Sequence, residues 1–201
     1  MDKHFRFSAI LLAISFSMLS FTTSISASER KINMNQHWKF YHGCIANAEQ
    51  PSFNDSGWRV LDIPHDWSVE PLPVQREGIT IGPFSRMSIG GPDTGQTVGG
   101  EGWYRKELIL QPGDTDKILS LYFEGAYNQT EVWINGQKAC FNAYGYIPFR
   151  IDINKYCNAP GIPNTIAVKV INEGLNSRWY AGSGIYRHVW LIKTDKVHLD
   201  E

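Results

Sequence analysis

The sequence carries almost no net charge and has no block of like charges. Its 201 residues include 19 Lys and Arg against 20 Asp and Glu, which gives a formal net charge of −1. Binding to nucleic acid or to an anionic membrane through electrostatics needs a basic patch or stripe. The composition therefore argues against both kinds of partner.

Cysteine is also scarce, and no metal-binding spacing is present. Cys44, Cys140 and Cys157 show no CxxC pattern and form no recognisable ligand set with the histidines. We therefore expect no metal site. In an oxidising compartment two of the three can pair, with Cys140 and Cys157 nearest in sequence, and a buried free thiol is the alternative for each.

Long hydrophobic runs are missing except near the N-terminus. Lys3 and Arg6 precede an apolar run at residues 7–21, and small residues follow at positions 24 and 26–28. This order predicts a signal peptide at residues 1–27 and an exported protein, periplasmic or secreted, that is free of the membrane after cleavage. The run contains serines and is short for a bilayer span, so a retained membrane helix is the weaker interpretation.

Helical periodicity is absent, and the remaining residues, roughly one domain's worth, have the pattern of strands. Leu119, Leu121 and Phe123 alternate with polar residues, and Asn135-Gly136 stands between two apolar runs. An Asn-Gly pair in that context predicts a hairpin. Further strands are expected at residues 103–110, 149–153, 165–171 and 189–194. Short strands at even spacing predict an all-β sandwich.

The first half of the chain predicts two strands and one ambiguous polar pair. Residues 32–41 indicate an early strand with Trp38 and Tyr41 available to a core, and residues 60–67 a short strand stopped at Pro64. His65 and Asp66 follow that proline. Such a pair can exchange protons, but neighbours in an extended chain point to opposite sides, so we interpret both as structural hydrogen-bonding residues.

Residues 70–102 form the least regular part of the sequence. Proline and glycine recur throughout this segment, and no strand or helix period is visible. A long connection of this kind is usually functional or mobile. Its glycines do not form a phosphate-binding loop, because the GxxxxGK[ST] pattern is absent and the segment leads into strand-like sequence.

Residues 177–190, SRWYAGSGIYRHVW, combine aromatic and basic side chains with two glycines. Gly182 and Gly184 allow close approach or positive φ, and the segment runs directly into an apolar strand. Flat aromatic faces beside Arg donors suit a ligand with apolar faces and many hydroxyls, of which sugars are the commonest. The alternative is a tryptophan-rich corner of the core.

Five motifs in order carry a family resemblance. They are IPHDW at Ile63, GWYRK at Gly102, FEGAYNQTEVWINGQ at Phe123, YGYIPFRIDI at Tyr144 and SRWYAGSGIYRHVWL at Ser177. Together they resemble the N-terminal sugar-binding domain of glycoside hydrolase family 2, the family of β-galactosidases, β-glucuronidases and β-mannosidases. The segment GGPDTGQTVGGEGWYRK is most similar to β-galactosidase-type enzymes that Bacteroides-like bacteria export.

The resemblance implies a fold and a division of labour. It implies a jelly-roll, galactose-binding-domain-like β-sandwich over residues 28–196, with residues 197–201 starting a linker to an immunoglobulin-like domain. In the family both catalytic carboxylates lie on a TIM barrel, so this chain is expected to supply no catalytic residue and to be inactive alone. The family needs no organic cofactor, and its ligand is a β-galactoside or a related glycoside.

The resemblance also names candidate site residues. In the family, the connection before GWYRK and the loop of the last motif shape the mouth of the barrel. In some β-galactosidases an Asp on that loop contacts galactose and a sodium ion, and the matching position here is Arg178. Because Arg cannot ligate a cation, no sodium site is expected, and Arg178, Trp179 and Tyr180 become candidate substrate contacts. The alternative places both aromatic residues in the core and Arg178 in an ion pair.

Three hypotheses of function follow. The chain is the front end of an exported β-galactosidase-like hydrolase, a free-standing carbohydrate-binding module, or a module that docks onto a separately encoded barrel.

Overall fold

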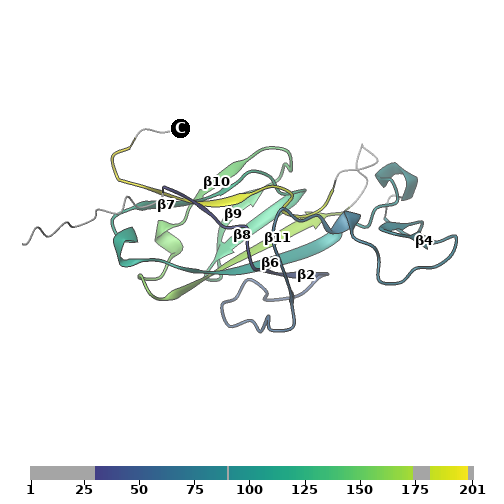
Figure 1. Ribbon diagram of the computed structural model, residues 1–201, viewed down its shortest axis with the longest axis horizontal. Helices are drawn as coiled ribbons and strands as arrows, with labels where there is room; N and C mark the ends of the chain where they lie inside the picture. The colour runs from purple at the N-terminus through teal and green to yellow at the C-terminus, as the bar shows by residue number, and fades with distance from the viewer. Residues whose placement is uncertain (1–29, 90, 174–181, 199–201) are drawn as a thin grey trace, which may run out of the picture.

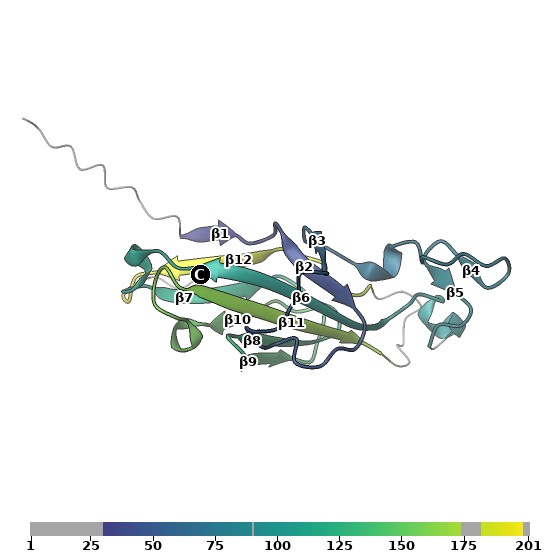
Figure 2. The ribbon, with the colours of Figure 1, turned by 90° about the horizontal axis from the view of Figure 1, so that it is seen from below.

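The computed structural model describes residues 30–89, 91–173 and 182–198, and it is a sandwich of two antiparallel sheets (Figures 1 and 2). Within these ranges the only helices are 3-10 turns: η1 Trp67–Val69, η2 Gly91–Thr94, η3 Pro112–Asp114 and η4 Asn154–Tyr156. None of the helices in the described ranges is long and apolar enough to cross a membrane. The predicted all-β sandwich of the jelly-roll type is confirmed.

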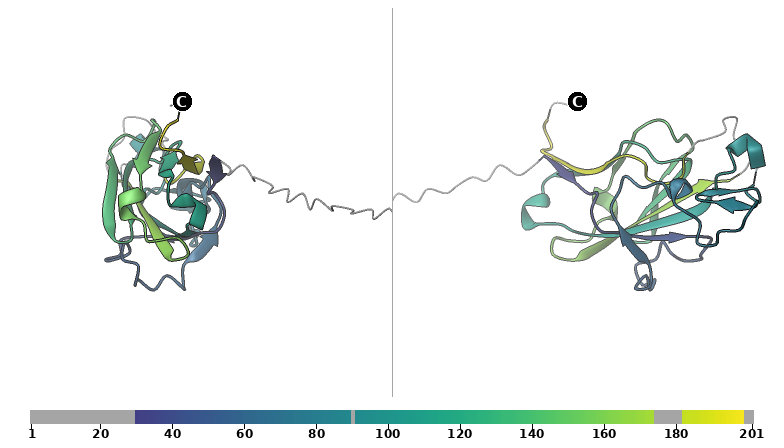
Figure 3. Two further views of the ribbon diagram at one scale, coloured as in Figure 1. Left: turned by 90° about the vertical axis from the view of Figure 1, so that its left-hand side faces the viewer. Right: turned by 45° about the vertical axis from the view of Figure 1, so that its right-hand side comes forward.

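One layer is a four-stranded sheet and the other is six-stranded. The smaller sheet has the order β1 Lys31–Asn33, β12 Val189–Thr194, β7 Ile118–Phe123 and β10 Phe149–Asp152. The larger has the order β3 Arg59–Leu61, β2 Trp38–His42, β6 Gly100–Ile109, β11 Pro163–Asn172, β8 Gln129–Ile134 and β9 Gln137–Asn142. Figure 3 shows the two layers end on.

The core lies between the layers and is built from the alternating residues of the central strands. Leu119, Leu121 and Phe123 of β7 are at most 2% exposed. They face Ile166, Val168 and Val170 of β11, all fully buried. Each such side chain contributes about 1.5–3 kcal/mol by leaving water, so the alternation read from the sequence is what holds the two sheets together.

The hairpin predicted at Asn135-Gly136 is confirmed. It joins β8 to β9, with Ile134 opposite Gln137. Asn135 has φ 52° and Gly136 φ 78°. Positive φ at both central residues is what a two-residue hairpin turn of matching twist requires.

Several expected element boundaries were wrong. The single early strand is two strands, β1 and β2, which belong to different sheets and are separated where His37 takes φ 58°. The strand expected at residues 60–67 is much shorter than predicted, because it consists of β3 alone, Arg59–Leu61. The strand expected from Trp103 begins at Gly100, because β11 continues to pair with it as far as Asn172 opposite Gly100.

The long connection is also more regular than predicted. It contains a small hairpin of β4 Thr80–Ile81 and β5 Phe84–Ser85, which projects beyond one end of the sandwich (Figure 1, right). The glycines that masked the start of β6 have a steric reason. A Cβ on Gly102 would overlap the Trp67 ring, so this strand can pass the indole only as glycine.

All three cysteines are free thiols. Cys44 is exposed, which contradicts the expectation of a buried thiol at that position, whereas Cys140 and Cys157 are half-buried. Burial raises the pKa of Cys157 to about 11, so its thiol stays protonated and unreactive at neutral pH.

Candidate functional site

The two connections singled out by sequence meet at one end of the sandwich. Residues 70–99 enter β6 there, and β11 leaves the same end at Asn172, opposite Gly100. Arg178, Trp179 and Tyr180 lie outside the described residues, so their role as substrate contacts stays a prediction. The structure describes both ends of that segment, at Glu173 and Gly182.

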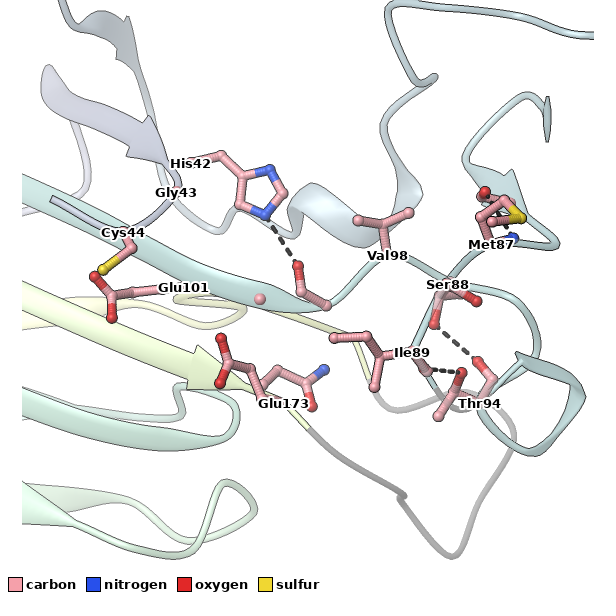
Figure 4. A pocket seen from close by; sticks show the side chains of 15 residues that line it. His42, Gly43, Cys44, Met87, Ser88, Ile89, Thr94, Val98, Glu101 and Glu173 are labelled. Atoms are coloured by element: carbon pink, nitrogen blue, oxygen red, sulfur yellow. Dashed lines mark hydrogen bonds between the residues drawn. The ribbon is translucent and has the colours of Figure 1, made fainter. Parts of the chain in front are cut away.

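A cavity of about 400 Å³, the loop pocket, opens at this end of the sandwich (Figure 4). Its lining comes from the end of β2, the residues around Met87 and Val98 of the long connection, the start of β6 and the end of β11. A cavity of this size falls within the range of small-molecule sites. Gly99 allows the end of the long connection to pass directly against the end of β11, because a Cβ at residue 99 would overlap the carbonyl oxygen of Asn172.

Polar groups are fixed around this pocket. His42 Nε2 donates to the carbonyl oxygen of Gly99 at 2.9 Å, as Figure 4 shows. Glu101 Oε1 accepts from the Trp103 indole N–H at 2.6 Å, which holds one carboxylate oxygen in place. Glu173 is exposed at the end of β11. The described lining thus carries two carboxylates and no Lys or Arg.

Asp66 and Asn172 anchor the backbone at Gly182 and Ser183. Asp66 Oδ1 accepts from the Ser183 backbone N–H at 2.7 Å and from the Ser68 N–H at 2.9 Å. Asn172 Nδ2 donates to the Gly182 carbonyl and to Ser183 Oγ, both at 2.8 Å. Because Asp66 precedes η1 and Asn172 ends β11, two separate parts of the fold hold the backbone at Gly182 and Ser183 in a fixed position.

His65 belongs to a separate, structural hydrogen-bond chain. The Tyr104 hydroxyl lies 2.7 Å from His65 Nδ1, and His65 Nε2 lies 3.1 Å from Glu70 Oε1. Arg59 Nη2 donates to both Glu70 oxygens at 2.8 and 2.9 Å. This places His65 and Asp66 on different partners, so the interpretation of the pair as structural is confirmed.

The pKa directions assign protons along this chain. Burial raises the pKa of the Tyr104 hydroxyl well above its ordinary value, so the hydroxyl stays protonated and donates to His65 Nδ1. Burial lowers the pKa of His65 despite the Glu70 carboxylate, so the ring is neutral and its Nε2–H donates to Glu70. Burial raises the pKa of Glu70, but the hydrogen bonds and charges of Arg59 and His65 together lower it by more, so Glu70 is ionised.

Sequence reasoning did not identify His42, Glu101 or Asn172 as site residues. His42 and Asn172 are 130 residues apart and come together only because β2 and β11 both flank β6. That neighbour order is not encoded in any local pattern. Among the described residues, no group of three or more His, Cys, Asp or Glu is arranged to hold a metal ion.

Comparison with known proteins gives a consistent family. Residues 38–195 match the profile described as glycosyl hydrolases family 2, sugar binding domain. The chain is 41% identical over 179 residues to the beta-galactosidase BoGH2A of Bacteroides ovatus, covering 89% of this chain and 20% of that protein. It is 30% identical over 193 residues to a beta-glucuronidase of Formosa agariphila, covering 89% of this chain and 18% of that protein.

Solved structures agree. A glycosyl hydrolase family 2 member from Bacteroides cellulosilyticus superposes with a TM-score of 0.77 at 40% identity, over 83% of this chain and 21% of that one. A beta-glucuronidase from Bacteroides uniformis superposes with a TM-score of 0.66 at 27% identity, over 82% of this chain and 18% of that one. The chain spans about a fifth of the length of these larger relatives. It belongs to glycoside hydrolase family 2 and contains the N-terminal sugar-binding domain of that family.

Proposed function

We propose that this chain is the N-terminal module of an exported, β-galactosidase-like glycoside hydrolase. In this role it shapes the substrate end of a TIM barrel that lies outside the chain, with an immunoglobulin-like domain between them. The observation that carries the proposal is the loop pocket, which forms where the long connection meets the ends of β2 and β11, and whose lining residue Asn172 also holds the backbone at Gly182. Export rests on the signal peptide expected at residues 1–27.

The module's contribution is binding rather than bond cleavage. A retaining glycosidase needs two carboxyl groups about 5–5.5 Å apart on either side of the scissile bond. Glu101 instead spends one oxygen on the Trp103 indole, and Glu173 is exposed at a strand end. The carboxylate of Glu101, held in place by Trp103, and that of Glu173 offer acceptors that suit sugar hydroxyls, with His42 beside them. Arg178, Trp179 and Tyr180 are proposed to complete these contacts from the adjoining segment.

The charge of the loop pocket favours a neutral sugar. A glucuronide carries a carboxylate, which Glu101 and Glu173 would repel and which Arg178 would attract, so two negative charges stand against one positive charge, whereas a galactoside offers only hydroxyls. Of the two activities that the names of the relatives mention, this argument supports the galactosidase.

The test begins with the reading frame beyond the Glu201 codon and with turnover. We expect the purified 201-residue chain to release no nitrophenol from an aryl β-galactoside. If the frame continues into a barrel, Glu101→Gln in the longer product should lower kcat/KM for the galactoside about 10-fold, the effect of one lost charge-assisted hydrogen bond.

The matched control is Glu107→Gln, because Glu107 lies on the same strand but is exposed and outside the loop pocket. It should leave kcat/KM unchanged. Turnover by the isolated chain would contradict the proposal, as would equal effects of the two variants. A stop codon with no barrel nearby would leave the free-standing carbohydrate-binding module, which calorimetry against galactosides would then test.

A further inference from the structure

A second cleft lies beside the loop pocket and plays no part in the proposal above. It has a volume of about 330 Å³, and we name it the Tyr41 cleft after the exposed aromatic residue in its lining. The other residues that matter are Trp58 and Arg59 at the start of β3, Glu70, and the apolar segment 71–73. We propose that the Tyr41 cleft is an accessory binding site for a neutral, β-linked oligosaccharide.

Tyr41 and Trp58 form an aromatic platform. Their rings are stacked with centroids 5.6 Å apart and an interplanar angle of 26°. Tyr41 was expected to be available to the core, but it is 39% exposed, because β2 turns Trp38 and Phe40 inward and Tyr41 outward. An outward aromatic pair of fixed orientation suits the apolar C–H face of a sugar ring.

Gly43 lies beside the Tyr41 ring of this platform. A Cβ at that position would lie 3.3 Å from Cε1 of the Tyr41 ring, so any longer side chain would rest against it. Gly43 also takes φ 137°, which other residues rarely adopt. The backbone beside the Tyr41 ring therefore carries no side chain at residue 43.

Arg59 and Glu70 supply polar groups that are already in place. Their ion pair is 2.8 Å long, and the side chains are 50% and 37% exposed. Arg59 uses Nη2 for Glu70, and its Nε and Nη1 donate to no described residue. Glu70 is held from the other side by His65. Donors and acceptors fixed before binding lose little freedom on meeting a ligand.

The balance of charge selects the class of ligand. Arg59 and Glu70 neutralise each other, so the cleft favours neither an acidic nor a basic ligand. An aromatic face beside hydrogen-bonding groups whose charges cancel fits a neutral carbohydrate. His42 and Val98 line both this cleft and the loop pocket, so an oligosaccharide bound here extends toward the proposed substrate end.

Binding of β-1,4-galactotetraose to the 201-residue chain tests the inference, with calorimetry for affinity and saturation-transfer NMR for contacts. Tyr41→Ala should weaken binding about 5-fold, as expected for one lost aromatic contact. Arg59→Gln should weaken it comparably. The control is Tyr144→Ala, because Tyr144 is 57% exposed and lies outside the cleft, and this variant should bind as the unchanged chain does.

Three results would overturn the inference: no binding at millimolar tetrasaccharide, equal losses for Tyr41→Ala and Tyr144→Ala, or loss of binding with Glu101→Gln alone. The last would place the ligand in the loop pocket and leave the proposed function standing. Circular dichroism checks the fold of each variant, and if Tyr41→Ala unfolds, Arg59→Gln against Tyr144→Ala decides.

Discussion

Gly184 sits at a crowded point of the fold, where it has no room for a side chain. It has φ 130°, and a Cβ there would overlap the Tyr104 hydroxyl and lie 2.6 Å from the His65 carbonyl oxygen. Its own backbone N–H and carbonyl pair with Tyr127. The residue therefore pairs with Tyr127 and packs closely against Tyr104 of β6 and the His65 backbone, and it does so only because it has no side chain.

Replacing this glycine should be costly. We expect Gly184→Ala to lower the free energy of unfolding by about 3 kcal/mol, since overpacking and an unfavourable φ act together. Urea unfolding measures this, with Gly57→Ala as the control, because a Cβ on Gly57 meets nothing within 4 Å. Equal stabilities of the two variants would contradict the prediction, because they would show that the backbone at Gly184 accommodates a Cβ without strain.

At this scale sequence reasoning succeeded where chain geometry alone decides. His65 and Asp66 follow one another in extended chain, so their separation onto different partners was predictable. The outward direction of the Tyr41 side chain was not predictable. An aromatic residue in a strand can face either side of the sheet, and only the pairing of β2 fixes which side it faces.

The hairpin of β8 and β9 is the element most fully determined by local sequence. Its turn residue Asn135 also ties the hairpin to the rest of the fold. Its Nδ2 donates to the Tyr156 carbonyl at 2.9 Å and to Asn164 Oδ1 at 2.8 Å, and its Oδ1 accepts from the Thr165 N–H at 2.9 Å. The same side chain thus shapes the turn and bridges to β11.

Asn135→Ala should lower the free energy of unfolding by about 2–3 kcal/mol. It removes three hydrogen bonds, leaves partners without donors or acceptors, and puts Ala at positive φ. Asn135→Gly, which tolerates that φ, should recover part of the loss. Denaturant unfolding of both variants measures the difference, and identical losses would mean that the backbone conformation contributes nothing.

Strand ends were the weakest sequence predictions, because a strand's own residues and its pairing with a neighbouring strand both determine where it begins and ends. β3 is an edge strand whose Val60 is 59% exposed, so its apolar residues do not mark a buried strand. β6 begins at two glycines, which carry no alternation, and its start is set by pairing with β11. Boundaries fixed by a partner strand cannot be read from one strand's own residues.

For the whole molecule, buried and ion-paired groups predict how stability depends on pH. Burial lowers the pKa of His65 below its ordinary value of 6.5, so the unfolded chain binds the proton more readily. Burial raises the pKa of Asp55, but the hydrogen bonds and charges of Lys39 and Arg105 together lower it by more, and those of Arg59 and His65 do the same for the pKa of Glu70.

The free energy of unfolding should therefore be highest above about pH 7 and fall in two stages as pH decreases. The first stage starts near 6.5 as His65 protonates, and the second below about 4.5 as Glu70 and then Asp55 protonate. Urea unfolding at several pH values measures the curve. His65→Gln should remove the first stage and keep the second, and a first stage that persists in this variant would contradict the assignment.

Sheet order was beyond sequence reasoning alone. Each layer joins strands from both halves of the chain, as where β1 pairs β12 and β2 pairs β6. Alternation shows which face of a strand is buried but not which strand lies next to it. The family resemblance supplied the architecture that periodicity does not contain.

The clamps at Gly182 and Asn172 have a consequence for how such a domain changes over evolutionary time. They use Asp66, Ser183 and the Asn172 side chain, none of which lies within residues 174–181. The backbone at Gly182 and Ser183 is therefore held by groups that lie outside that segment. Asp66 and Asn172 thus limit which changes the scaffold can accept over evolutionary time, since replacing either would remove a hydrogen bond that fixes the backbone at this point.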